Sequence, residues 1–215
     1  MYLAIIGDLV RSRKLSASER RQVQQKLKSC LLTINQDYAD ELASDFIITL
    51  GDEFQGLLQT PESVLIIIER IRSCLGAYKL RFGLGIGSIY TPIEATSIGA
   101  DGPAYHAARR ALDVIKEQAR RSEQPSTSIR LEKEDRDTSL INSLLAQLHF
   151  QEEGWTAKQT QIVWGMREAD SQKELARSLQ VSQPYINQVL QGTGYYTYRS
   201  SQTALTTAIQ ELFHD

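Results

Sequence analysis

Residues 46–58 read FIITLGDEFQGLL, and this stretch decides the fold. Two β-rich runs, 46–50 and 54–58, are separated only by Gly51, Asp52 and Glu53. Such short spacing is typical of a β-hairpin, with its turn at the carboxylates. We therefore expect a β-sheet built around this hairpin, with the acidic residues at one end of it.

Before the hairpin, the sequence predicts a strand and a long helix. Residues 2–6 are continuously apolar, which suits a strand covered on both faces, and Asp8 follows at its C-terminal end. Ser16 or Ser18 can cap a helix with an apolar stripe. That stripe consists of Val23, Leu27, Cys30, Leu31 and Ile34. This helix would cross from the first strand to the hairpin.

After the hairpin, Pro61 in a first helical turn opens an apolar helix that runs to Leu75. Residues 80–90 return as a Gly-rich strand, so the element order is βαββαβ. A helix over 104–119, a polar break at 122–128 and a short edge strand at 128–132 follow. From residue 137 onward the pattern is helical only. We therefore expect two domains, residues 1–136 and 137–215.

Composition limits the function classes. The net charge of -2 argues against a protein that mainly coats nucleic acid or an anionic membrane, so any DNA contact must be local. No apolar stretch is long enough to span a membrane, and residues 1–10 form a strand pattern without a signal peptide's charged start. Cys30 and Cys74 lie in apolar helical patterns and are expected to be small buried hydrophobes. These features favour a cytoplasmic protein without a membrane partner.

Asp8, Asp52 and Glu53 are the candidate metal ligands. The end of the first strand and the tip of the central hairpin lie side by side in a βαββαβ sheet, which would bring these carboxylates together. Two carboxylates 4 Å apart repel by about 4 kcal/mol at an effective dielectric near 20, and a divalent cation removes this conflict. Oxygen ligands without His or Cys favour Mg²⁺ or Mn²⁺. The alternative is that Gly51 and Asp52 form an ordinary turn and Asp8 approaches a helix.

Several segments resemble known families, in the families' own order. LGDEF at 50–54 resembles the GGDEF signature of diguanylate cyclases, with Leu50 in place of the first Gly. RFGLGIG at 81–87 resembles the RxGIGIHTG strand of class III nucleotidyl cyclases, and DGPAYHAAR at 101–109 resembles their GDTVNLAAR helix. Taken together, IIGDLVRSRKL, ITLGDEFQGLL and IGADGPAYHAARRAL look most like the SatD family of bacterial proteins.

The cyclase resemblance implies an α+β fold: a ferredoxin-like βαββαβ palm followed by an all-α domain. It implies that metal ions on Asp8 and Asp52, with Glu53 as a further ligand, hold a nucleoside triphosphate or cyclic nucleotide. The expected nucleotide-binding residues are Asp8, Leu9, Arg11, Ser12, Arg13 and Gly51. Arg11, Arg13 and Lys14 would meet phosphates where the chain enters the first helix, with its dipole adding to the attraction. A solvated basic loop is the other interpretation.

Two departures from the cyclase pattern concern catalysis. On the final cyclase helix an Asn and an Arg steady the transition state, and Tyr105 stands at the Asn position while Arg109 matches the Arg. Tyr can donate a hydrogen bond, but with a different reach, which weakens cyclisation more than nucleotide binding. Leu50 argues against cyclic di-GMP synthesis, because its side chain would obstruct close substrate approach. His106 is expected to be a packing or surface residue.

Residues 171–190 have the layout of a helix-turn-helix. Leu175, Ala176 and Leu179 face inward, the turn lies near 180–182, and Ser182 caps the second helix. The expected double-stranded DNA contacts are Ser182, Gln183, Tyr185, Asn187, Gln188 and Arg199. The alternative is that this unit packs against its own palm or contacts another protein. A last amphipathic helix over 203–213 is expected to serve in docking or in a homodimer.

Three hypotheses follow. The first is a cytoplasmic regulator whose Mg²⁺-dependent nucleotide-binding palm is coupled to a DNA-binding helix-turn-helix. The second is an active metal-dependent nucleotidyl cyclase or nucleotidyltransferase. The third is a protein-interaction scaffold without a ligand.

Overall fold

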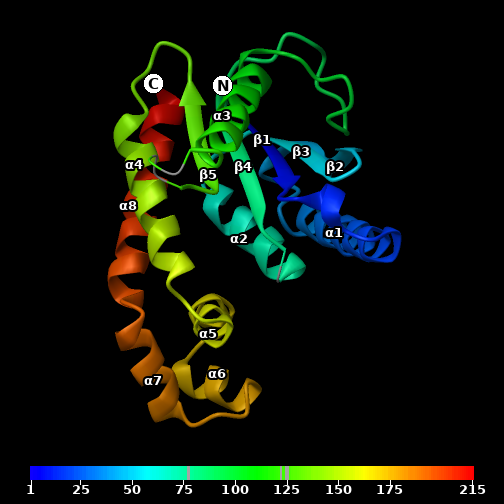
Figure 1. Ribbon diagram of the computed structural model, residues 1–215. Coiled ribbons are helices and arrows are strands. Elements are labelled where there is room, and N and C mark those ends of the chain that lie inside the picture. The colour runs from blue at the N-terminus through cyan, green and yellow to red at the C-terminus, as the bar shows by residue number, and fades with distance from the viewer. Residues whose placement is uncertain (77, 122, 124–125) are drawn as a thin grey trace.

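The computed structural model describes residues 1–76, 78–121, 123 and 126–215, with only the backbone of residue 168 (Figure 1). The strands are β1 (Tyr2–Leu9), β2 (Leu42–Leu50), β3 (Glu53–Leu58), β4 (Leu80–Gly87) and β5 (Ile129–Lys133). The helices are α1 (Ala17–Asp37), α2 (Val64–Leu75), α3 (Pro103–Gln118), α4 (Ser139–Glu153), α5 (Ala157–Glu168), α6 (Gln172–Ser178), α7 (Gln183–Gly192) and α8 (Tyr195–His214), with a short 3-10 helix, η1 (Ser12–Lys14). The protein is therefore α+β, as expected.

The five strands form one sheet in the order β2-β3-β1-β4-β5. β1 lies between β3 and β4 and is antiparallel to both, while β5 pairs with β4 in parallel at the edge. This confirms the expected βαββαβ order and the edge strand after it. β2 begins at Leu42, earlier than the expected 46, because the buried alternation also includes Ser44. Part of the polar break expected at 122–128 lies outside the described residues.

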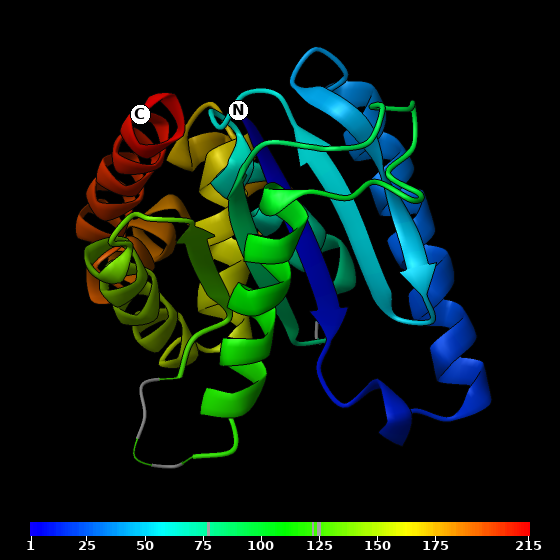
Figure 2. The same ribbon diagram turned by 90° about the horizontal axis from the view of Figure 1, so that it is seen from above.

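Alternation along β4 explains how helices cover both faces of the sheet. Phe82 and Leu84 belong to the core cluster that contains the buried residues of α1 and α2. On the other face, a Cβ at Gly83 would lie 2.1 Å from Ala108 O, and one at Gly85 would lie 2.1 Å from Ala104 O. Glycine is therefore required where the backbone of α3 packs directly on β4. Figure 2 shows α3 lying along the sheet on this face.

The β2–β3 turn is tied to α1. Gly51 has a φ of 64°, the left-handed conformation that favours glycine, and Gln24 Nε2 donates a hydrogen bond of 2.6 Å to Gly51 O. The turn comprises residues 51–52, and Glu53 is already the first residue of β3. Glu53 is therefore a strand residue whose position is set by the ladder, and its place in the turn was predicted wrongly.

The two cysteines, both expected to be buried, differ in their exposure. Cys30 on α1 is buried, as predicted, but Cys74 on α2 is exposed. The prediction for Cys74 was wrong because the helix's apolar stripe runs through Ile67, Ile71 and Leu75, leaving position 74 outside it.

The C-terminal helices pack on each other and on the β5 side of the sheet, with α4 and α8 side by side (Figure 1). Helix α8 begins at Tyr195, eight residues before the expected start, after Gly194 with a φ of 65°. Its apolar residues Leu205, Ile209 and Phe213 are buried within the chain. The last helix is thus a docking element of its own chain.

Apolar residues on both sides of residue 136 belong to one hydrophobic cluster, which includes Leu65 of α2, Leu145 of α4 and Leu205 of α8. The division at 136 stays a prediction, and the two segments share a core across it. Across the described ranges, none of the helices is long and apolar enough to cross a membrane.

Candidate functional site

Two acidic residues face each other in the sheet, and α3 supplies a cation to each. Asp8 of β1 pairs in register with Glu53 of β3. Lys116 Nζ lies 2.9 Å from Asp8 Oδ2, and Arg109 donates two hydrogen bonds of 2.6 Å to the two carboxylate oxygens of Glu53. The repulsion expected between the carboxylates is therefore already offset by two basic side chains.

One oxygen of Asp8 is left over. The Asp8 side chain is only 13% exposed, and its Oδ1 atom is buried without a hydrogen-bond partner among the described residues. Leaving a buried charged oxygen unsatisfied costs more than the roughly 1–3 kcal/mol of a neutral group. Such an atom fits a hard cation or a water molecule bound to one.

The Arg109–Glu53 pair uses both carboxylate oxygens, unlike the contact of Lys116 with a single oxygen of Asp8. The bidentate hydrogen bonds from Arg109 lower the pKa of Glu53 below its usual value, against the opposing effect of partial burial, and the charge of Lys116 adds to the lowering. Glu53 is therefore ionised at neutral pH, and both of its oxygens are used by Arg109.

Asp52 lies in a different environment from the other two carboxylates. It lines a small pocket with Leu9, Ser12 and Gln24, beside α1, whereas Asp8 and Glu53 contact α3. Within the described ranges, no group of three or more His, Cys, Asp or Glu side chains could hold a metal ion. The structure thus brings Asp8 and Glu53 together, with Asp52 directly before Glu53 in the turn.

The basic loop follows Asp8 directly, and its geometry is defined. Arg11 adopts a left-handed φ of 60° before η1, and Arg11, Arg13 and Lys14 are exposed while Ser12 is half-buried. The N-terminus of α1 is closed by a capping box, in which Ser16 accepts from Glu19 N and the Glu19 side chain accepts from Ser16 N. Glu19 already occupies the positive end of this helix, so the loop's own side chains are what a phosphate would meet.

Tyr105 and Arg109 have different accessibility. The Tyr105 ring is buried against Ile6 and Leu57, and its hydroxyl has no hydrogen-bond partner within the part of the chain that the structure describes. Burial raises the pKa of Tyr105 to about 12, and nearby Ser97 offsets only part of this effect. The hydroxyl is therefore neutral and enclosed, while Arg109 is 42% exposed.

One further residue at this site, Lys116, escaped sequence reasoning, whereas Arg81 was already part of the Gly-rich strand match. Lys116 follows Arg109 by seven residues, about two helical turns, which places both on one face of α3. Arg81 of β4 is the register partner of Asp8 on its other side. The helical spacing of Arg109 and Lys116 was the available signal. His106 pairs with Asp101 at 2.7 Å on the surface, as expected for a surface residue.

In the helical segment, α6 and α7 are two short consecutive helices joined by residues 179–182. Ser182 caps α7 by accepting from Tyr185 N, as predicted, and Gln180 takes a left-handed φ of 54° in the turn. The expected DNA-contacting residues of α7, namely Gln183, Tyr185, Asn187 and Gln188, are all exposed. Arg199 is half-buried and donates to Gln202 Oε1 at 3.2 Å, so its guanidinium is engaged within α8.

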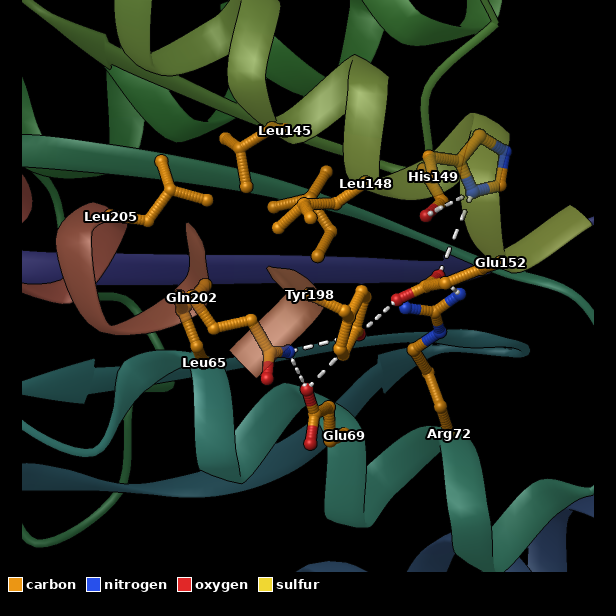
Figure 3. A pocket seen from close by; sticks show the side chains of 12 residues that line it. Leu65, Glu69, Arg72, Leu145, Leu148, His149, Glu152, Tyr198, Gln202 and Leu205 are labelled. Carbon is orange, nitrogen blue, oxygen red and sulfur yellow. Dashed lines mark hydrogen bonds and ion pairs between the residues drawn. The ribbon is translucent and has the colours of Figure 1, made fainter. Parts of the chain in front are cut away.

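A second polar cluster lies between α2, α4 and α8 (Figure 3), and Arg167 of α5 contacts it through Glu69. Arg72 contacts Glu152 at 2.6 Å, and Arg167 pairs with Glu69. Tyr198 donates its hydroxyl proton to Glu152, and Glu69 Oε1 lies 3.5 Å from the same hydroxyl oxygen. The cavity at this cluster has a volume of about 20 Å³, which holds about one water molecule and excludes a nucleotide. This cluster therefore joins the helical segment to α2, and the candidate ligand site is the one at Asp8.

Taken together, the fold and this site define a class of α+β protein in which a helix supplies counterions to an acidic pair at the end of the central strand. Residues 2–209 match the SatD family. The chain belongs to the SatD family, which confirms the expectation from its motifs.

No curated protein matches this chain. Among solved structures, "Structure of a bacterial light-regulated adenylyl cyclase" is similar, with a TM-score of 0.45 and 14% sequence identity, over 60% of this chain and 74% of that chain.

Proposed function

We propose that the N-terminal sheet is a ferredoxin-like palm that binds a nucleoside triphosphate together with Mg²⁺ or Mn²⁺. The single observation that carries this proposal is the buried, unpartnered Oδ1 of Asp8 at the end of the central strand. A carboxylate oxygen in that state fits a hard cation, and such a cation is commonly completed by substrate phosphates.

The residues around Asp8 supply the remaining parts of such a site. Asp52, in the turn before Glu53, is the proposed second carboxylate ligand, and its side chain would have to turn from the pocket beside α1 toward Asp8 when the cation binds. Arg11 and Arg13, exposed directly after β1, are the proposed phosphate contacts, with Leu9, Ser12 and Gly51 as the surrounding backbone. When bound, the cation supplies the positive charge that neutralises carboxylates and phosphates at close range.

Binding is favoured over turnover. Arg109, which matches the transition-state arginine of the cyclases, donates two hydrogen bonds to Glu53. The hydroxyl of Tyr105, at the position of the cyclase Asn, is buried in the core. A cyclase or nucleotidyltransferase would need both groups at the substrate. Pyrophosphate release from ATP, GTP, CTP or UTP with Mg²⁺ or Mn²⁺ would establish the enzymatic alternative.

The helical segment is proposed to be a helix-turn-helix that binds double-stranded DNA, so that the whole protein acts as a nucleotide-responsive regulator. Support comes from α7, which buries Ile186, Val189 and Leu190 and exposes polar side chains on the opposite face. Mobility shifts on genomic DNA fragments, with and without nucleotide, test this half. Absence of any shift in both conditions would contradict it.

The nucleotide half is tested by thermal-shift titrations with ATP, GTP, CTP and UTP, each with and without Mg²⁺. A ligand that binds only the folded state raises the unfolding midpoint. We expect a Mg²⁺-dependent rise with one nucleotide, lost in Asp8→Asn and retained in Asp40→Asn, a change at an exposed carboxylate on the surface. No rise with any nucleotide would favour the scaffold interpretation.

A further inference from the structure

The two cations that α3 places over the acidic pair differ in how firmly they are held. Arg109 grips Glu53 through two parallel hydrogen bonds of 2.6 Å, which fix both partners. Lys116 touches Asp8 through one oxygen only, at 2.9 Å, and its side chain is 30% exposed. A lysine ammonium is a point charge on a flexible stem, so the Lys116–Asp8 contact is the one that can be exchanged.

Lys116 contacts the same carboxylate that would bind the cation, that of Asp8. Asp8 is the carboxylate with an unpartnered oxygen, and the Lys116 ammonium neutralises it through the neighbouring oxygen of the same group. A divalent cation on Oδ1 would lie within a few ångströms of that ammonium, where like charges repel strongly in a partly buried site. Bare metal and Lys116 therefore compete for one carboxylate.

We propose that Lys116 is a resident counterion that blocks free divalent cations from Asp8 and gives way when the cation arrives with a nucleotide. The inference rests on the proposed function and adds a selection step to it. Phosphate groups carry the negative charge that allows the ammonium to remain nearby after it leaves Asp8 Oδ2. The site therefore takes a metal–phosphate complex in preference to the metal alone, and Lys116 becomes a phosphate contact in the bound state.

The test measures Mn²⁺ binding by electron paramagnetic resonance, without nucleotide, on full-length wild type, Lys116→Met, Lys116→Arg and Asp8→Asn. Removing a like charge beside a cation site is expected to tighten Mn²⁺ binding by about tenfold or more. We expect this gain in Lys116→Met only, because Lys116→Arg keeps the positive charge. Lys28→Met, at an exposed lysine on α1, serves as the control and should match wild type. Circular dichroism verifies that each variant is folded.

A second measurement separates the inference from the function on which it rests. The Mn²⁺ retained with the protein after ultrafiltration is measured at saturating ATP, GTP, CTP or UTP in turn, because these nucleotides also bind Mn²⁺ in solution. Wild type should retain Mn²⁺ with one of them, and Asp8→Asn with none. If wild type binds in this condition but Lys116→Met shows no gain without nucleotide, the counterion role is wrong and the proposed function stands. If Lys116→Arg gains as much as Lys116→Met, the charge argument is wrong. If no variant binds Mn²⁺ with or without nucleotide, both proposals fail.

Discussion

Arg72 on α2 and Glu152 on α4 form an ion pair of 2.6 Å, with only 14% and 9% of their side chains exposed. Tyr198 of α8 donates a hydrogen bond to the same carboxylate. The pair therefore joins a helix of the sheet layer to the C-terminal helices inside the shared core (Figure 3). A buried pair of this kind matters most when one partner is removed, because the other is left as an uncompensated charge.

Replacing Arg72 by Met is expected to destabilise the protein by about 3–5 kcal/mol, because the Glu152 carboxylate stays buried without its partner. Arg70→Met on the same helix is the matched control. Arg70 pairs with Asp37 at 2.8 Å, but these side chains are 31% and 43% exposed, and such pairs contribute about 1 kcal/mol or less. Urea unfolding compares the two, and equal losses would contradict a special role for the buried pair.

Glu152 also predicts acid sensitivity. Burial alone would raise the pKa of Glu152, but the charge of Arg72, nearby His149 and the hydrogen bond from Tyr198 outweigh it and lower this pKa to about 2. Because the pKa of Glu152 is lower in the folded state than its ordinary value of 4.5, the ionised carboxylate stabilises the folded state at pH values above 4.5. This stabilisation is lost as the pH falls from 4.5 toward 2. The loss is about 3 kcal/mol. Unfolding free energies from pH 5 to pH 2 should fall less steeply for Glu152→Gln, and parallel curves would contradict the assignment.

Gly85→Ala is expected to cost about 3 kcal/mol or more. Its Cβ would lie 2.1 Å from Ala104 O and 2.3 Å from Ala108 N, and helix backbone cannot move aside as a flexible side chain can. Gly192→Ala at the end of α7 is the control, because its Cβ would meet nothing within 4 Å, and it should be neutral or slightly stabilising. Thermal unfolding of both variants measures the difference. A tolerated Gly85→Ala would show that α3 does not pack on β4 this closely.

Tyr105→Phe distinguishes a core residue from a catalytic one. The Tyr105 hydroxyl is buried without a hydrogen-bond partner in the described parts of the chain, so its removal should leave stability unchanged or raise it by about 1 kcal/mol. Nucleotide binding should also be unchanged. A loss of nucleotide affinity in a variant of normal stability, measured by calorimetric titration, would instead show that Tyr105 contributes to nucleotide binding.

The double variant Asn187→Ala, Gln188→Ala tests the proposed DNA-binding face. Both side chains are exposed on α7, and each base contact contributes about 1–3 kcal/mol, so DNA affinity should fall at least about tenfold without loss of stability. Thr203→Ala with Thr207→Ala, two exposed residues of α8, is the control pair. Unchanged DNA affinity in the α7 variant would exclude this face of α7 as the DNA-contacting surface.

Local signals in the sequence were enough to predict the framework. The hairpin around residues 51–52, the Ser182 cap, a cap at Ser16 or Ser18 and the Gly-rich β4 each depend on neighbouring residues. Each was confirmed, with Ser16 as the first cap and with strand bounds that differ from those expected. Long-range pairing was not predictable in the same way. Lys116 reaches Asp8 because Gly83 and Gly85 let α3 lie against the sheet. The seven-residue spacing places Lys116 on the same face of α3 as Arg109, but it does not name Asp8 as the partner.

The same reason explains the buried polar cluster. Glu69 contacts Arg167 and Gln202, which lie far along the chain, so their role depends on how the helical segment docks against α2. Burial raises the pKa of Glu69, with Arg167 and Gln202 offsetting only part of that effect. In the sequence these residues look like ordinary charged or polar positions of amphipathic helices.

The most direct test of the central claim is a crystal structure with Mn²⁺ and a non-hydrolysable nucleoside triphosphate analogue, with anomalous data collected at the manganese edge. The account predicts an anomalous peak within coordination distance of Asp8 Oδ1, about 2.0–2.2 Å, with phosphate oxygens beside it. A bound nucleotide without a peak there, or a peak whose ligands exclude Asp8, would contradict the claim that this carboxylate holds the cation.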